Sequence, residues 1–86
     1  MAIEGYRRSS LDILAQILAA SETGINKTRL LIRCNLNSPQ AQRYLDVALG
    51  SELLTRENNG GRPQFRTSPK GRTFLKTYKL LESIVE

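Results

Sequence analysis

The chain has 86 residues, which leaves room for one domain with one hydrophobic core. A composition of 40% hydrophobic and 24% charged residues excludes an intrinsically disordered chain. A single cysteine and the absence of histidine exclude an intramolecular disulfide and the usual zinc sites, so we expect no metal and no cofactor.

The charge of the chain is positive. Thirteen Lys and Arg residues against eight Asp and Glu give a net charge of +5, and nine of the thirteen are arginines. A guanidinium group donates two parallel hydrogen bonds, a geometry that suits phosphate groups and guanine. Polyanionic partners are therefore favoured, but many small proteins are equally basic, so the positions of the arginines have to decide.

A first helix is predicted at about residues 10–21. Ser9 and Ser10 precede an apolar run, and Asp12 lies three residues after Ser9, as in a capping box. The apolar side chains that recur at helical spacing are Leu11, Leu14, Ile17 and Leu18, with Ile13 at the edge of the stripe. Gly24 follows the helix as a stop signal.

A short second helix is predicted after Asn26, a good N-cap residue. Its inward side chains are Leu30, Leu31 and Cys34. The tight connection Asn35-Leu36-Asn37 follows, with two Asn that tolerate left-handed backbone and one Leu that can point inward. Two helices joined in this way are typical of a helix-turn-helix.

The third helix has the clearest start, with Ser38 as the expected N-cap and Pro39 at the first helical position. Helical spacing gathers Ala41, Tyr44, Leu45, Ala48 and Leu49 on one side and leaves Gln40, Gln42, Arg43, Asp46 and Val47 outside. Gly50 is expected to weaken or end this helix.

A β-hairpin with a basic tip is predicted next. Leu53–Glu57 and Gln64–Ser68 suit strands, and the segment 58–63 between them is rich in turn formers. Ser68-Pro69 then starts a fourth helix at 69–86. This order predicts a mainly α protein with a small β-hairpin: a winged helix-turn-helix with a three-helix core, a two-stranded wing and a C-terminal helix, all in one domain at 1–86.

This arrangement predicts a surface for double-stranded DNA. The major groove, about 12 Å wide, admits one helix, and the second helix of such a pair presents its N-terminal residues to the bases. We expect helix 39–49 to read the major groove and the wing at 58–63 to contact the backbone or the minor groove. The predicted DNA-binding residues are Lys27, Thr28, Asn37, Ser38, Gln40, Gln42, Arg43, Arg56, Arg62 and Arg66.

Each of these residues also has a purely structural interpretation. Gln and Arg on the third helix could simply solvate an exposed face, and Lys27 could equally be solvated. Arg56 and Arg66 could deter aggregation at a sheet edge, whereas Arg62 at the predicted tip suits that role less well.

The fourth helix carries more apolar side chains than a small core needs. Phe74, Tyr78, Leu81 and Val85 follow one another at spacings of four, three and four, which is typical of a coiled-coil seam. Leu80 and Ile84 form a second apolar edge. We expect Phe74, Tyr78, Leu81 and Val85 to form a homodimer interface. The alternative is that both stripes pack within their own chain.

Several short motifs resemble one family. They are Asp12-Ile13-Leu14, Gly24-Ile25-Asn26-Lys27-Thr28-Arg29, Tyr44-Leu45 and Thr67-Ser68-Pro69-Lys70-Gly71-Arg72. The chain is similar, from about Arg8 to Leu81, to the small archaeal winged helix-turn-helix family typified by a ten-kilodalton chromosomal DNA-binding dimer. The resemblance implies a winged-helix fold, dimerisation through the C-terminal helix, and DNA binding without catalysis.

The functional hypothesis is therefore a DNA-binding transcriptional regulator or chromosomal protein. With no signal-peptide or membrane segment, we expect it in the cytoplasm, associated with the nucleoid. The alternative is a winged-helix module for protein–protein interaction, motivated by Val47 and the apolar excess of the fourth helix. The absence of histidine, of a paired-carboxylate pattern and of a phosphate-cradling loop argues against an enzyme.

Overall fold

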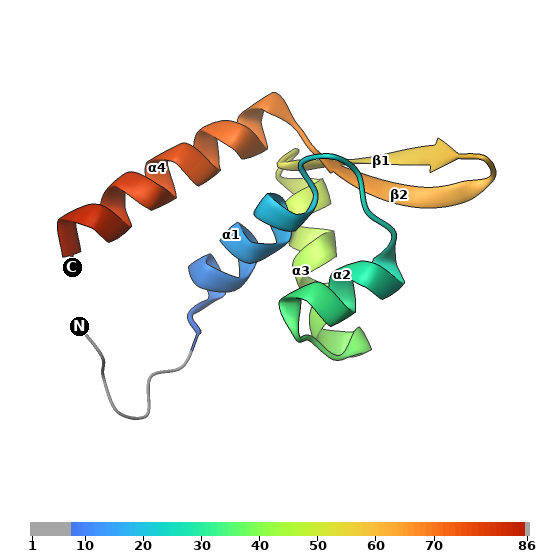
Figure 1. Cartoon of the computed structure of the whole chain (residues 1–86), viewed down its shortest axis with the longest axis horizontal. Helices are drawn as coiled ribbons and strands as arrows, with labels where there is room; N and C mark the ends of the chain where they lie inside the picture. The colour runs from blue at the N-terminus through green and yellow to red at the C-terminus, as the bar shows by residue number, and fades with distance from the viewer. Residues whose placement is uncertain (1–7, 86) are drawn as a thin grey trace.

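The structure, a computed structural model, describes residues 8–85. Its elements are α1 (Ser10–Ala20), α2 (Lys27–Cys34), α3 (Ser38–Gly50), β1 (Leu54–Asn59), β2 (Arg62–Thr67) and α4 (Pro69–Val85), as Figure 1 shows. The predicted fold class, a winged helix-turn-helix that is mainly helical, is confirmed. In the described part no helix is long and apolar enough to cross a membrane.

Helix α1 begins at the predicted capping box. The Ser9 hydroxyl accepts a hydrogen bond from the Asp12 backbone N–H, and the Asp12 carboxylate accepts one from the Ser9 N–H. The side chains of Ile17 and Leu18 are completely buried. Leu11 was expected in the same stripe, but it lies in the first turn of α1 and is 54% exposed, whereas Ile13 and Leu14 further along the helix are buried.

The helix-turn-helix is formed by α2 and α3. Asn26 caps α2 as predicted, and its side chain accepts a hydrogen bond from the Arg29 N–H. Asn35 adopts the left-handed conformation with φ 53°, which lets the chain turn sharply, and Leu36 is buried between the helices. The expected roles of this connection are confirmed.

The cap of α3 differs from the prediction by one residue. Asn37, not Ser38, is the N-cap, because its side chain accepts a hydrogen bond from the Gln40 N–H while the Gln40 side chain accepts one from the Asn37 N–H. Ser38 is therefore the first helical residue and Pro39 the second. Asparagine and serine are about equally good N-caps, and a glutamine three residues after Asn37 completes a capping box.

The hairpin is longer and its turn tighter than predicted. The strands pair in antiparallel register from Leu54 opposite Thr67 to Asn59 opposite Arg62, so the turn contains only Gly60 and Gly61. Both glycines have positive φ, 61° and 82°, as a two-residue hairpin turn requires. Ile25, in the α1–α2 connection, pairs with Phe65 at the other edge of β2, a short third partner that the sequence analysis did not predict.

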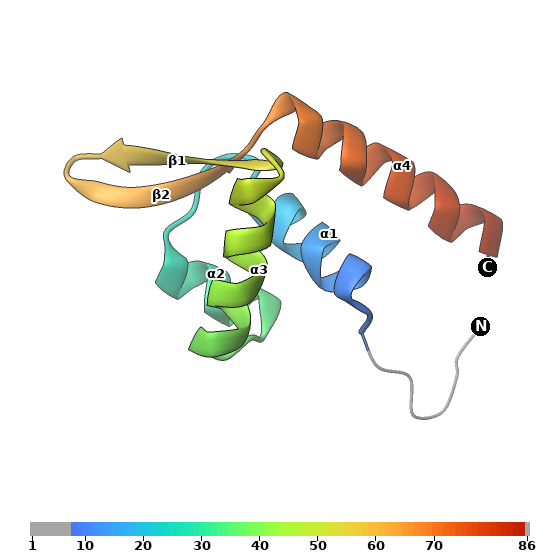
Figure 2. The same ribbon diagram turned by 180° about the vertical axis from the view of Figure 1, so that it is seen from behind.

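Helix α4 packs on the core through its residues up to Tyr78. Leu75 and Gly71 are buried, and Ser68 caps the helix by accepting a hydrogen bond from the Gly71 N–H. The Tyr78 hydroxyl donates to the Asp12 carboxylate and thus joins α4 to α1. Figures 1 and 2 show α4 running past α1, with the hairpin projecting on the opposite side of the molecule.

Candidate nucleic-acid interface

The outer face of α3, defined as Gln42, Arg43, Asp46 and Val47, is exposed as predicted. The opposite side of the helix carries Ala41, Leu45 and Ala48, which are completely buried. Burial of one side fixes the rotation of the helix about its axis, and the polar side chains therefore face outward. In Figure 2, α3 lies in front of α2 and beside the base of the hairpin.

A chain of hydrogen bonds joins α2 to the outer face of α3. The Lys27 ammonium donates to Gln42 Oε1 at 2.7 Å, and Gln42 Nε2 donates to Asp46 Oδ1 at 2.8 Å. Lys27 therefore lies on the flank of α2 that faces α3. Gln42 keeps one amide hydrogen for an external acceptor, because an amide nitrogen has two.

Arg43 is held differently from its neighbour. Its guanidinium carbon lies 6.0 Å from the centre of the Tyr44 ring, within the range of a cation–π contact. Among residues 8–85 no carboxylate forms an ion pair with Arg43. The charge of this side chain is therefore available to an external anion or to a base.

The residues at the start of α3 are partly used by the cap. The side-chain oxygens of Asn37 and Gln40 both accept backbone hydrogen bonds in the capping box, which leaves only their amide N–H groups for a ligand. Ser38 is exposed, and so is Thr28 at the start of α2. These two hydroxyls could meet a phosphate without disturbing the fold.

The three hairpin arginines do not share one face. Because side chains alternate along a strand, Arg56 lies on the same face as its partner Phe65, and its guanidinium lies 5.5 Å from the Phe65 ring centre. Phe65 is part of the core, so this face is turned toward the helices. Arg62 and Arg66 lie on the other face.

Arg62 and Arg66 also differ from each other. Arg62 is the first residue of β2 and directly follows the turn; it was expected inside a longer loop, but the two glycines close the hairpin before it. Arg66 lies at the base of the hairpin, where its Nε is 2.8 Å from Glu57 Oε1, and its guanidinium lies against Gly24. Arg66 is thus partly neutralised and has a structural partner.

Sequence and structure comparisons agree with this architecture. A family model described as winged helix-turn-helix matches residues 7–86. The chain belongs to this family. No curated protein matches it in sequence.

Solved structures with a similar fold include the following three. Sso10a-2, a DNA-binding protein from Sulfolobus solfataricus, gives a TM-score of 0.82 at 23% identity, with 90% of this chain and 81% of that chain covered. The transcriptional regulator BldR, from the same organism, gives 0.73 at 20% identity over 85% of this chain and 56% of that chain. F93 from STIV, a winged-helix DNA-binding protein, gives a TM-score of 0.69 at 17% identity, with 93% of this chain and 95% of that chain covered.

The apolar seam predicted on α4 of this winged-helix chain is divided in two. Phe74 and Tyr78 are half-buried and pack against the core of their own chain. Leu81 and Val85 are 55% and 82% exposed. The second apolar edge, Leu80 and Ile84, is also exposed. The other described residues therefore leave four apolar side chains at the distal end of α4 more than half exposed.

Some residues have roles that the sequence analysis did not assign. Arg8 donates to the backbone oxygens of Cys34 and Asn35, at 2.5 and 3.0 Å, and so satisfies the C-terminus of α2. Its neighbour Arg7 lies outside the described residues. Cys34, by contrast, is buried as the sequence predicted, and burial raises the pKa of its thiol, against a smaller lowering by Arg8 and Arg33. It is a core residue that stays protonated.

Proposed function

We propose that this protein binds double-stranded DNA as a transcriptional regulator or chromosomal protein, with α3 in the major groove. The observation that carries the proposal is the outer face of α3: Gln42 and Arg43 project from a helix whose other side is fixed by burial, next to a hairpin and to Lys27. Both Sso10a-2 and F93, which have this fold, are DNA-binding proteins. The proposal includes no catalytic step.

The chemistry of each side chain on α3 indicates which part of the DNA it would contact. Arg43 has the guanidinium fork that pairs with guanine, and the remaining amide hydrogens of Gln40 and Gln42 suit adenine or a phosphate. Ser38, Thr28 and Lys27, at the starts of α3 and α2, suit the phosphate backbone. A helix of 13 residues is about 20 Å long, enough to follow the groove for part of a turn.

In this proposal the wing contributes two arginines and not three. Arg62 is exposed beside the turn and can enter a minor groove, where narrow A·T-rich segments attract arginine. Arg56 is exposed on the helix-facing side of the hairpin and can reach a backbone phosphate. Arg66, paired with Glu57, mainly steadies the hairpin base.

The second part of the proposal is a homodimer formed through the distal half of α4. Leu80, Leu81, Ile84 and Val85 are each more than half exposed. Burying a leucine or valine side chain of this kind is worth about 1.5–3 kcal/mol, so two such helices gain by packing together. A two-fold dimer would present two α3 helices to two half-sites of DNA.

Duplex DNA titrated at several salt concentrations tests the DNA-binding proposal. Each neutralised phosphate contributes about −0.9 to the slope of log K against log salt, so about five contacts give a slope near −4.5. Arg62→Gln should make the slope less negative by about 0.9, whereas Lys76→Gln, exposed on α4, should leave it unchanged. Absence of binding at low salt would refute DNA binding.

One observation favours a second function, a protein-interaction module. Val47 is 48% exposed on the outer face of α3, where a DNA-reading helix is usually polar. If a protein partner docks there, Val47→Ser should abolish capture of that partner, and the chain should not shift duplex DNA. Retention of DNA binding by Val47→Ser, with no protein captured by the wild type, favours the first function.

A further inference from the structure

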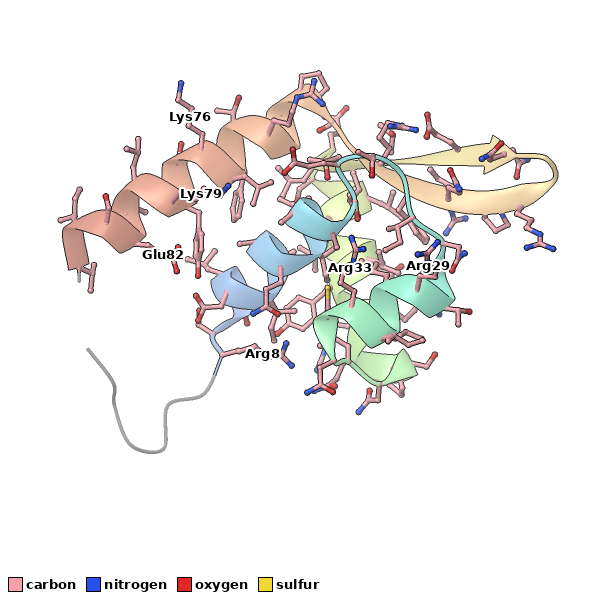
Figure 3. The ribbon with its side chains drawn as sticks, in the orientation of Figure 1. Arg8, Arg29, Arg33, Lys76, Lys79 and Glu82 are labelled. Atoms are coloured by element: carbon pink, nitrogen blue, oxygen red, sulfur yellow. The ribbon has the colours of Figure 1, made fainter. Side chains whose placement is uncertain are left out.

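The cations of α2 project in two directions. At about 100° per residue, Arg29 lies about 160° and Arg33 about 120° around the helix from Lys27. Lys27 contacts Gln42 on α3, so both arginines belong to the other side of α2. Figure 3 shows them on the side of α2 turned to the viewer, while α3 passes behind. They lie away from the outer face of α3.

These two arginines line a polar hollow in the surface. It has a volume of about 150 Å³ and lies between α2, the α1–α2 connection and β2. The residues that line it are Ala20, Thr23, Gly24, Ile25, Asn26, Arg29, Arg33 and Gln64. None of these is acidic, while a hydroxyl and two amides accompany the guanidinium groups. The hollow has room for several water molecules, and hence for a phosphate group.

The charges around the hollow have no ion-pair partner among the residues that the structure describes. Arg29 and Arg33 are one helical turn apart, so they repel each other, and within residues 8–85 neither has an ion-pair partner. Arg66, the next arginine, is already paired with Glu57. An anion in the hollow would relieve the repulsion and accept hydrogen bonds from both forks, the geometry that phosphate prefers.

We propose that Arg29 and Arg33 bind the phosphate group of a small phosphorylated ligand in this hollow, which is turned away from the outer face of α3. The side chains of Thr23 and Gln64 are placed to add neutral hydrogen bonds. Phosphate binding here does not require DNA binding, so the failure of one proposal leaves the other testable.

The experiment is an NMR titration of the full chain with inorganic phosphate. Sodium chloride is lowered as phosphate is added, so that the ionic strength stays constant. We expect saturable shifts in the amides of residues 23–26 and in the side-chain Nε–H groups of Arg29 and Arg33. Arg29→Gln and Arg33→Gln should each raise the dissociation constant about tenfold, the loss of one charge-assisted interaction. Lys76→Gln, which removes the same charge from α4, should not change it. Shifts that do not saturate, or that give the wild-type dissociation constant in both arginine variants, would overturn the proposal.

A second arm separates this site from a DNA contact. Arg29→Gln and Arg33→Gln should bind duplex DNA with the same affinity and salt slope as Lys76→Gln. Loss of DNA affinity in the two arginine variants beyond that in Lys76→Gln would mean that the phosphates come from the duplex backbone, and the separate small-ligand site would be wrong. Because both arginines are exposed, the variants should keep the wild-type amide spectrum outside the hollow.

Discussion

Gln42 and Arg43 are adjacent on α3 but differ in how freely they can act. Gln42 is held at both ends of its amide, by Lys27 and by Asp46, so its position is set before any ligand arrives. Arg43 lies against the Tyr44 ring, and among residues 8–85 it has no such hydrogen-bond partners. Holding a side chain in place lowers the entropy lost on binding, whereas a free arginine can adapt to the base it meets. At the scale of the residue, Arg43 is the better candidate for reading sequence.

Substitution of Arg43 tests that role. If Arg43 pairs with guanine, Arg43→Ala should relax the preference at one base pair by about 1–3 kcal/mol and weaken binding to other sequences much less. Selection of duplexes from a randomised pool by wild type and variant measures this, with Lys76→Ala as the control for lost charge. Identical selected sequences bound equally tightly would remove Arg43 from the site, and a uniform loss would assign it to a phosphate.

At the scale of the element, Gly71 allows the start of α4 to lie close to Leu53, the residue just before β1. A Cβ atom added at Gly71 would lie 2.2 Å from the backbone oxygen of Leu53 and 2.7 Å from Thr67 Cγ2. This Leu53 oxygen also accepts a hydrogen bond from the Ser68 N–H. Glycine inside a helix normally costs stability, so close packing is the physical reason for it here.

Gly71→Ala should therefore lower the free energy of unfolding by about 1–3 kcal/mol, the usual cost of overpacking, although alanine favours the helix. The matched control is Gly50→Ala at the end of α3, where an added Cβ meets nothing within 4 Å; it should be neutral or stabilise by up to about 1 kcal/mol. Urea denaturation at one fixed protein concentration measures both. Equal stabilities of the two variants would contradict the packing argument.

At the scale of the whole molecule, the shape is elongated, 44 × 26 × 19 Å, because α4 runs past α1 on one side and the hairpin extends on the other. The two ends have opposite character. The hairpin end is polar and carries Arg62, while the distal end of α4 carries four exposed apolar side chains. Polar ends can remain in water, but a contiguous apolar end favours association.

We expect the wild type to have the mass of a dimer by light scattering and Leu81→Asp/Val85→Asp to be a monomer, because charges cannot be buried unpaired in the interface. The variant Leu80→Asp/Ile84→Asp tests the second apolar edge: it should be a monomer only if that edge takes part in the interface. The control is Ile32→Asp, which alters a 77% exposed side chain on α2 and should leave the mass unchanged. A monomeric wild type would refute dimerisation, and a dimeric Leu81→Asp/Val85→Asp variant would refute the Leu81–Val85 seam.

The sequence by itself determined the features that depend on neighbours along the chain. The Ser9 cap with Asp12, the Asn26 cap and the left-handed Asn35 were predictable, because caps and turns are satisfied by residues within a few positions. The outer face of α3 was predictable for a similar reason, since helical periodicity separates buried from exposed positions. The α3 cap was misplaced by one residue, because two adjacent residues are equally able to cap.

Only the tertiary structure decided what depends on contacts distant in sequence. The register of the hairpin divided its arginines between two faces and paired Arg66 with Glu57, and packing on the core of their own chain took Phe74 and Tyr78 out of an otherwise continuous apolar seam. The hollow below Arg29 and Arg33 exists because β2 brings Gln64 against the α1–α2 connection. Periodicity gives the direction in which a side chain leaves its helix or strand, but what it meets there is set by the packing of the elements.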